Sequence, residues 1–361
     1  MQLKFQIAAE RLLSNKSNYK NMTKNLVFDK KNVLIIGGAG FIGSHICDQL
    51  IKNNKVICLD NFSTGDEKNI DQLLSDPNFE FIRHDITEPI DLIKFKELQK
   101  FRIEWQGIQE IYNLACPSLP IHFIKNKIPT LLANSYGTKN SLDLAIKYKS
   151  KFMHFSSAVI YGQTQDNEIK IKEENIGQVD LLSDRSAYNE GKRFAETIII
   201  NYKNVYHLDA KIIRVFRTYG PRMKLDEGNM IPDFINNALD NKDLLVMGDK
   251  NFSSSFCYVS DVVDAAVKMM ETDSAGPINI GSDININITD LANKIIAILN
   301  SKSKIIYDKE NNFLSLLYLP DITKARNELG WLPVINLEAG LKETINDLQA
   351  SKGLKGIREL L

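Results

Sequence analysis

The sequence predicts a doubly wound parallel α/β sheet followed by a smaller C-terminal lobe. Short apolar runs alternate with helical stretches up to Pro221, and the runs are rich in β-branched and aromatic residues. They show little polar alternation, which is typical of strands covered on both faces. Strands that alternate with helices in this way form a parallel sheet, because each crossover helix returns the chain to the same edge.

The expected elements follow that alternation in order. Strands are predicted at Asn32–Ile36, Lys55–Leu59, Phe79–Arg83, Glu110–Leu114, Phe152–Ser156 and Lys211–Phe216. Helices are predicted between them at Phe41–Lys52, Pro129–Tyr148 and Arg185–Tyr206, and Pro129 suits the first turn of its helix. After Pro221 strands and helices alternate less regularly. Helices are predicted there near Met230–Asp240, Asp261–Met270, Ile288–Leu299 and Leu337–Leu348.

These elements divide the chain into three parts. Residues 1–30 are interpreted as an N-terminal extension, with a helix near Ile7–Leu13 and a polar connector. Residues 31–220 are expected to form the sheet domain, to which a segment near 256–282 returns. Residues 221–255 and 283–361 form the smaller lobe, which is expected to close over the carboxyl edge of the sheet, where ligands of open α/β sheets bind.

Composition argues against several classes of partner. The 45 basic and 45 acidic residues cancel, so there is no electrostatic case for a nucleic acid or a membrane surface. No run approaches the roughly 18 apolar residues of a membrane span. The first 30 residues lack the apolar stretch of a secretory signal. Five scattered histidines and four distant cysteines make no metal pattern, and the thiols are expected to be reduced, as in a cytoplasmic protein: Cys47, Cys58, Cys116 and Cys257.

A glycine-rich turn after the first strand predicts a dinucleotide site. Gly37, Gly40 and Gly43 follow the apolar strand and open a helix, which lets a pyrophosphate approach the free N–H groups of the helix N-terminus. Asp60 ends the next strand, 23 residues after Gly37, where its carboxylate can accept from an adenosine ribose hydroxyl. The same carboxylate would repel a 2′-phosphate, so NAD is the expected cofactor and not NADP.

Tyr188 and Lys192 are the candidate catalytic pair. Four residues apart on a helix, their side chains lie on one face. A phenol normally loses its proton near pH 10, and a neighbouring ammonium is expected to lower the pKa of Tyr188 toward the working range. Tyr188 could then take the proton from a sugar hydroxyl while a hydride leaves the same carbon. Ser157, which follows a predicted strand, is placed to hydrogen-bond the reacting oxygen.

This order of motifs resembles that of the extended short-chain dehydrogenase/reductases that modify nucleotide sugars, whose fold is of the Rossmann type. The resemblance runs from about residue 32 to residue 348. Several stretches look most like UDP-glucuronate decarboxylases, also called UDP-xylose synthases: Ile57–Phe62, Phe81–Pro89, Tyr112–Pro117, Thr218–Met223, Ser255–Asp261, Pro320–Ile322 and Leu329–Trp331.

The resemblance implies a role for each matching position. Tyr188 would be the base, Lys192 would bind the nicotinamide ribose and tune Tyr188, and Ser157 would orient the sugar hydroxyl. NAD would stay bound and be regenerated, because the sugar is oxidised at C4, changed and then reduced. The remaining cofactor-binding positions, which surround the pyrophosphate and the adenosine or underlie the cofactor, would be Gly37, Gly40, Phe41, Ile42, Gly43, Asp60, Asn61, Asp85, Ile86, Leu114 and Ala115.

Four positions depart from the decarboxylase pattern. Val159 stands where the pattern has an acidic residue, and Ser254 and Leu319 stand where it has arginines. Arg217 stands where it has an asparagine. Two cations that would meet a sugar nucleotide are therefore gone and one is new, which favours a repositioned or altered substrate over neutral drift. The predicted substrate contacts are Arg217, Arg222 and Tyr258.

Val159 helps to separate the candidate reactions. A valine can neither give nor take a proton, which counts against a 4,6-dehydratase, because dehydration needs acid–base groups at C5 and C6. A decarboxylase makes a β-keto acid that loses carbon dioxide without a base at C5, but it still needs a proton donor afterwards, so Val159 weakens this interpretation without excluding it. A 4-epimerase needs only Ser157, Tyr188, Lys192, NAD and room for the ketosugar to turn over. UDP-glucuronate decarboxylation is the favoured hypothesis, and a UDP-sugar 4-epimerase, including one that acts on a uronate, is a close second.

The expected partners are a UDP-linked sugar and a second copy of the chain. By resemblance, a homodimer would form through the helices near 130–148 and 186–206. A non-catalytic NAD-binding protein is the alternative from another class. The intact set of Ser157, Tyr188 and Lys192 argues against that alternative.

Overall fold

The core of the protein is a sheet of seven parallel strands. The computed structural model describes residues 29–162, 170–225, 227–247, 250–308 and 318–359, so the predicted helix near Ile7–Leu13 lies outside the described residues. Neighbouring strands pair in parallel throughout, in the order β12-β7-β5-β4-β1-β2-β3. The predicted fold class is confirmed. The bounds are β1 Asn32–Ile36, β2 Lys55–Asp60, β3 Phe79–Arg83, β4 Glu110–Asn113, β5 Lys151–Ser157, β7 Ala210–Val215 and β12 Ile278–Ile280.

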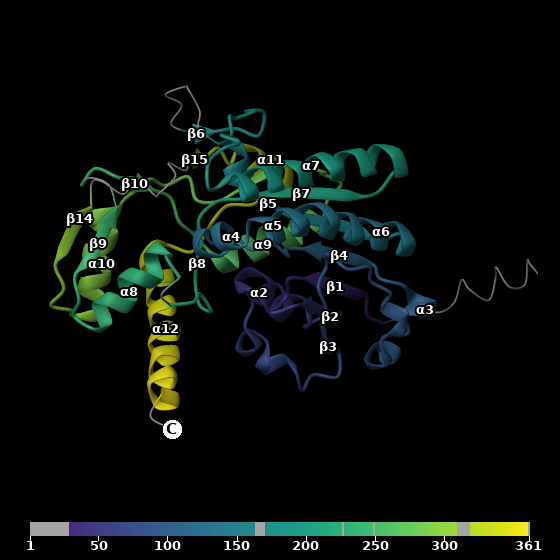
Figure 1. Ribbon diagram of the computed structural model, residues 1–361, viewed down its shortest axis with the longest axis horizontal. Helices are drawn as coiled ribbons and strands as arrows, with labels where there is room; N and C mark the ends of the chain where they lie inside the picture. Colours follow the sequence, from purple (N-terminus) through teal and green to yellow (C-terminus); the bar gives the residue numbers. More distant parts are fainter. Residues whose placement is uncertain (1–28, 163–169, 226, 248–249, 309–317, 360–361) are drawn as a thin grey trace, which may run out of the picture.

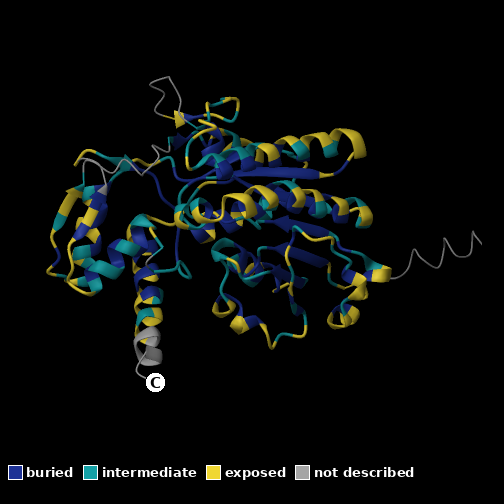
Figure 2. Cartoon of the chain, in the orientation of Figure 1, coloured by how far each residue is buried: buried dark blue, intermediate teal, exposed yellow. Residues whose placement is uncertain are grey.

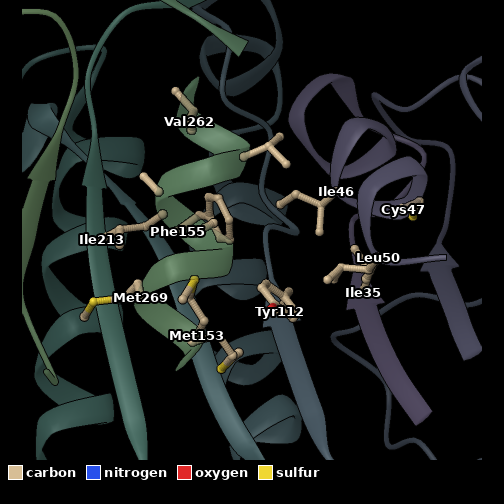
Figure 3. Packing of buried hydrophobic residues seen from close by; sticks show 14 of the residues in the cluster. Ile35, Ile46, Cys47, Leu50, Tyr112, Met153, Phe155, Ile213, Val262 and Met269 are labelled. Atoms are coloured by element: carbon tan, nitrogen blue, oxygen red, sulfur yellow. The ribbon is translucent and has the colours of Figure 1, made fainter. Parts of the chain in front are cut away.

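Helices cover both faces of this sheet (Figure 1). Successive side chains of a strand point to opposite faces, so Ile35 packs in one apolar cluster while Leu34 packs in another. In the first cluster, Met153 and Ile213 of the sheet lie against Met269 (Figure 3). The covering helices are α2 (Phe41–Leu50), α9 (Val259–Glu271) and α11 (Thr323–Leu329) on that face, with α6 (Thr138–Tyr148) and α7 (Ser186–Tyr206) on the other.

Burial follows these layers. The central strands of the sheet are mostly dark blue in Figure 2, and the helices that cover them show yellow on their outer faces. All five residues of β1 are buried, which explains why this strand reads as a continuous apolar run with no polar alternation.

A smaller lobe lies beside the carboxyl edge of the sheet (Figure 1). Its apolar core joins Phe234, Leu291 and Leu341. The helices of this lobe are α8 (Met230–Leu239), α10 (Ile288–Leu299) and α12 (Leu337–Glu359). Its longest strand pair is β9 (Leu244–Met247) with β14 (Ile305–Asp308). Shorter pairs are β8 (Thr218–Tyr219) with β11 (Cys257–Tyr258), β10 (Ser253–Ser254) with β13 (Ile286–Asn287), and β15 (Leu319–Pro320) with β6 (Lys170–Ile171).

Some local predictions were wrong. The single helix expected at Pro129–Tyr148 is interrupted by a π-helical turn, so that α5 (Lys127–Leu132) and α6 flank the turn at Ala133–Gly137. Two short helices, α3 (Ile103–Gln106) and α4 (Pro120–Lys125), were not expected. The division into a sheet domain and a lobe stays a prediction. Trp331, which that division assigned to the lobe, is fully buried against the helices of the sheet.

Among the described residues, no helix combines the length and the apolar character needed to cross a bilayer. In the same part of the chain, no three His, Cys, Asp or Glu side chains gather as a metal site.

Candidate active site

A cavity of about 720 Å³ lies at the carboxyl edge of the sheet, and its volume suits a small-molecule site. Its wall is built from the residues that follow β1, β2, β4, β5 and β7 and from the loop after β8. Every predicted cofactor position lines it, as do the three predicted catalytic residues and two of the three predicted substrate contacts. These residues are Gly37, Gly40, Phe41, Ile42, Gly43, Asp60, Asn61, Asp85, Ile86, Leu114, Ala115, Ser157, Tyr188, Lys192, Arg217 and Arg222.

The glycine turn leaves backbone exposed to the cavity. Gly37 has a φ of +81°, and a Cβ at this position would lie 2.8 Å from the backbone nitrogen of Ala115. A Cβ on Gly43 would collide with the backbone oxygen of Gly37, so the start of α2 can approach the turn only without a side chain. Gly40 precedes the first residue of α2 and lines the cavity with it. This arrangement presents helix N–H groups to an anion such as a pyrophosphate.

Asp60 is held rigidly at the end of β2. Its two carboxylate oxygens accept hydrogen bonds from the backbone nitrogens of Ala39, at 3.0 Å, and Phe62, at 2.9 Å. Burial raises the pKa of this carboxyl group, and the two backbone donors oppose that shift. A fixed acceptor beside the glycine turn is the group that an adenosine ribose requires, so these residues fit NAD.

Asp85 and Asn61 form a second polar contact on the same wall. The amide nitrogen of Asn61 donates to Asp85 at 2.9 Å, and both residues line the cavity. Partial burial favours the neutral acid, but hydrogen bonds from Thr87 and Asn61 outweigh it and lower the pKa of Asp85. Asp85 is therefore an ionised acceptor at neutral pH.

The candidate catalytic residues come from two elements. Ser157 ends β5, and its hydroxyl oxygen accepts from the backbone nitrogen of Val159 at 3.4 Å. Tyr188 and Lys192 lie on α7, are 6% and 4% exposed, and line the cavity together. Lys192 donates a hydrogen bond from Nζ to the backbone oxygen of Phe155 at 2.8 Å. The helix thus brings both side chains to the end of the strand that carries Ser157.

The expected activation of Tyr188 by Lys192 is not found. Burial raises the pKa of the Tyr188 phenol, and only a hydrogen bond from Ser157 and the charge of Arg185 act in the opposite direction. Burial also lowers the pKa of Lys192. Helical spacing predicts that the two side chains share a face, but it does not reveal that both are enclosed, and enclosure opposes either charge.

Phe123 of α4 lies flat on Tyr188. The ring centroids are 4.8 Å apart and the ring planes differ by 2°. Val159 packs in the same small apolar cluster, is 8% exposed, and lies outside the cavity lining. The position where the resembled enzymes carry an acid is therefore part of an apolar wall behind Tyr188.

The two positions that lack arginines are also closed off from the cavity. Ser254 is buried in β10 and Leu319 is buried in β15, and neither lines the cavity. The third predicted substrate contact, Tyr258, is not part of the lining either, and its contact with a substrate stays a prediction. Its ring packs edge-on against Tyr219, with centroids 5.5 Å apart, and so it faces the lobe.

Arg222 joins the two parts of the molecule beside the cavity. Its guanidinium pairs with Asp48 of α2, and its backbone nitrogen donates to Asp347 of α12 at 2.7 Å. His122 of α4 makes a similar link, because its Nε2 lies 3.2 Å from a carboxylate oxygen of Glu227 in the loop after β8. Both His122 and Glu227 line the cavity, and neither was singled out from the sequence.

A buried polar network under the cavity was also missed. Ser156 donates to Glu196 at 2.5 Å, and Arg214 binds both oxygens of Glu196 at 3.0 and 2.8 Å. Arg214 also donates to the hydroxyl of Tyr161 at 2.9 Å. Glu196 follows Lys192 by four residues on α7, so helical spacing was the one available signal. The network fixes α7 to β5 and β7 at the level of the catalytic residues.

The sheet, its glycine turn and this cavity are those of an NAD-dependent enzyme of the short-chain dehydrogenase/reductase class. The sequence profile of the family described as GDP-mannose 4,6 dehydratase matches residues 34–344. The chain therefore belongs to this family, a branch of the extended short-chain dehydrogenase/reductases.

Similar proteins narrow the class further. UDP-glucuronic acid decarboxylase 5 of Arabidopsis thaliana is 38% identical over 336 residues, which cover 92% of this chain and 94% of the relative. UDP-glucose 4-epimerase of Thermotoga maritima, solved with UDP-glucose, superposes with a TM-score of 0.78 at 26% identity, covering 89% of this chain and 99% of that one. UDP-glucuronic acid 4-epimerase of Bacillus cereus, solved with UDP-glucuronic acid and NAD, gives a TM-score of 0.76 at 27% identity, with the same coverage. The protein is an NAD-dependent nucleotide-sugar enzyme.

Proposed function

We propose that the protein oxidises UDP-glucuronate at C4, that the resulting β-keto acid loses carbon dioxide, and that the ketone is reduced again to give a UDP-pentose. The observation that carries this proposal is that Ser157, Tyr188 and Lys192 line one cavity with the glycine turn and Asp60. The relatives that are decarboxylases, at 38% identity in one case, support the same reaction.

The roles of the side chains follow from their positions. Tyr188 takes the proton of the C4 hydroxyl, and Ser157 donates a hydrogen bond that orients the reacting oxygen. Lys192 is fixed by the backbone oxygen of Phe155 and holds the nicotinamide ribose. NAD, when bound, supplies the acceptor for the C4 hydride and returns it at the end. The net change is loss of carbon dioxide and gain of one proton at C5.

Val159 argues against dehydration. Removing water across C5 and C6 requires a base and an acid. Val159 can serve as neither, and it packs in an apolar cluster with Phe123 and Tyr188. Loss of carbon dioxide from a β-keto acid needs no base, because the electron pair of the broken C–C bond moves into the neighbouring carbonyl group. Decarboxylation therefore suits the residues that the cavity contains.

A 4-epimerase acting on the same UDP-uronate is the second candidate, and the apolar surroundings of Val159 favour it. Epimerisation at C4 requires no proton donor at C5. The ketosugar only has to turn over before the hydride returns to its other face. Two of the similar solved structures are 4-epimerases of UDP-sugars.

Incubation of the purified protein with UDP-glucuronate separates the candidates. Carbon dioxide and a UDP-pentose support the first, and UDP-galacturonate supports the second. The matched control is Tyr188→Phe, which should abolish turnover and leave NAD bound, because the ring and its packing on Phe123 are kept. A protein that binds NAD and turns over no nucleotide sugar would exclude both candidates and leave a non-catalytic NAD-binding role.

We further propose that a second copy of the chain covers the outer face of α5 and α7. Large apolar side chains are exposed on these helices and on the π-helical turn after α5, among them Ile128 of α5 at 64%, Tyr136 of the turn at 61% and Phe194 of α7 at 49%. Monomeric proteins seldom expose such a group of side chains together. Sedimentation velocity should give the mass of a dimer, and Phe194→Glu should shift it toward the monomer, whereas exposed Trp105→Glu on α3 should not.

A further inference from the structure

Arg217 places a positive charge in the wall of the cavity. It follows the end of β7 at Val215 and precedes β8, and it lines the same cavity as Tyr188. Its backbone oxygen accepts from the backbone nitrogen of Cys257 at 2.9 Å, which fixes this part of the chain. The decarboxylase pattern has an asparagine at this position, so the cation is a feature of this chain.

A second arginine lies close to the same place. Arg185 immediately precedes α7, and its guanidinium carbon is 5.6 Å from the centroid of the Phe123 ring. Tyr188 stacks on the same ring, with the ring centroids 4.8 Å apart. Arg185 and the candidate base therefore both contact Phe123, and the charge of Arg185 acts on the pKa of Tyr188.

The two arginines act on each other electrostatically. Burial lowers the pKa of Arg217 to about 10, and the charge of Arg185 contributes to that shift. Burial also lowers the pKa of Arg185. Two like charges held near each other in a partly enclosed wall oppose each other, and an anionic ligand reduces that repulsion.

We propose that Arg217, with the charge of Arg185 behind it, binds the carboxylate at C6 of the sugar, so that the protein selects nucleotide-linked uronates over neutral hexoses. This inference rests on the proposed function, because the position of C4 is taken from Tyr188. Arg217 is the contacting residue, and Arg185 adds to the positive potential without lining the cavity.

The connectivity of the sugar favours the carboxylate over the diphosphate. In a hexopyranose C6 is carried by C5, the direct neighbour of C4, whereas the diphosphate is attached to C1 across the ring. Arg217 and Tyr188 line the same cavity, and each interacts electrostatically with Arg185, so a cation in this wall can meet the C6 substituent of a sugar whose C4 hydroxyl faces Tyr188. The planar, positively charged guanidinium can bind both oxygens of a carboxylate, whereas an asparagine side chain is neutral and has no positive charge to offer.

Binding by full-length protein with the Tyr188→Phe change measures this selectivity without turnover. UDP-glucuronate and UDP-glucose differ only in the C6 group, and UDP reports on the shared part. The parent should bind UDP-glucuronate more tightly than UDP-glucose. Arg217→Asn should weaken UDP-glucuronate about tenfold to a hundredfold and leave UDP-glucose within about twofold, because one charge-assisted contact is lost. Arg185→Gln should lower the same selectivity by a smaller factor.

The controls address folding and charge. Arg326→Asn, at an exposed position of α11, should leave all three affinities unchanged. Arg217→Lys keeps the charge but not the two-pronged contact, so it should lose part of the selectivity. It also provides the measurement if Arg217→Asn does not fold. Melting temperature and bound NAD are recorded for every variant.

Two results would overturn the inference. One is a parent protein without preference for UDP-glucuronate, and the other is an equal loss for UDP-glucuronate, UDP-glucose and UDP in Arg217→Asn. Failure of the proposed function looks different. If the protein that retains Tyr188 binds UDP-glucuronate selectively through Arg217 but turns over no substrate, the proposed reaction is refuted and the recognition site is kept. If the protein turns over UDP-glucuronate but Arg217→Asn leaves the selectivity unchanged, the recognition site is refuted and the proposed reaction is kept.

Discussion

Lys192 donates its hydrogen bond to the backbone oxygen of Phe155, at 2.8 Å, and so its ammonium is anchored to the sheet. Tyr188, one helical turn earlier, is stacked under Phe123 with its pKa raised by burial. The candidate base is therefore protonated at neutral pH in the protein alone. Conversion to the phenolate depends on raising the pH or on positive charge brought by the bound cofactor.

The pH profile of kcat/KM should show this state of Tyr188. Because the raised pKa keeps the phenol protonated near neutrality, the basic form grows as pH rises, and kcat/KM should increase about tenfold per pH unit on the acid limb. The lowered pKa of Lys192 should end the rise on the alkaline side, where the ammonium is lost. Tyr188→Phe should show no acid limb, because its turnover should be abolished at every pH. A flat profile between pH values of about 6 and 9 would contradict the assignment.

Val159→Glu should change the product distribution. A carboxyl group at this position would stand in the apolar cluster beside Phe123 and Tyr188, where burial favours its neutral, proton-donating form. We expect a larger share of UDP-pentose among the products of UDP-glucuronate, at a stability cost of about 1–3 kcal/mol. Liquid chromatography of the products and thermal unfolding measure both. Val159→Gln has the same size and cannot donate a proton from an acid, so an equal change in that variant would contradict the explanation.

Asp60→Asn should relax the choice of cofactor. The substitution removes the charge that repels a 2′-phosphate and weakens the acceptor for the ribose hydroxyl, while one backbone donor, from Ala39 or Phe62, loses its partner. NAD should bind about tenfold more weakly, and the ratio of NADP to NAD affinity should rise. Calorimetric titration of both cofactors tests this, with the exposed Asp71→Asn as control. An unchanged ratio would show that Asp60 does not face the ribose.

Glu196→Ala should destabilise the protein strongly. Glu196 and Arg214 are about one tenth exposed, and removing one partner leaves the other charge buried, which typically costs about 3–5 kcal/mol. Glu190→Ala on the same helix breaks the more exposed contact with Arg193, 3.3 Å long, and should cost about 0–1 kcal/mol. Urea denaturation gives both free energies. Similar losses for the two variants would mean that the buried network contributes little.

Elements that depend on local pattern could be predicted well. β1 and β3 have the predicted bounds, because short apolar runs bounded by polar residues leave little choice of register. The π-helical turn at Ala133–Gly137 could not be foreseen, because a single wider turn of five residues is too short to show a period of its own. α4 was missed for the same reason, because six residues are too few to show a period.

The same distinction applies to the site. The glycine turn and Asp60 carry their context within a few dozen residues, and the cavity brings them together as expected. Contacts between distant segments had no local signal. Phe123 on Tyr188 and the nearness of Arg185 to Arg217 depend on how α4, α7 and the end of β7 meet. The pKa of Tyr188 was predicted in the wrong direction because burial by such segments outweighs the hydrogen bond from Ser157 and the charge of Arg185.

The burial of Trp331 has a consequence for how the protein is made. Its indole nitrogen donates to the backbone oxygen of Asp261 at 2.9 Å, and its ring fills the apolar layer on one face of the sheet. The edge strand β12 also comes late in the chain and pairs with β7. When β7 has been synthesised, the residues of α9 and α11 that cover this face of the sheet are therefore still missing from the nascent chain. The apolar layer on this face of the sheet is complete only when the chain has been synthesised past residue 331, although α9, which carries Met269, is made earlier and covers Met153 and Ile213.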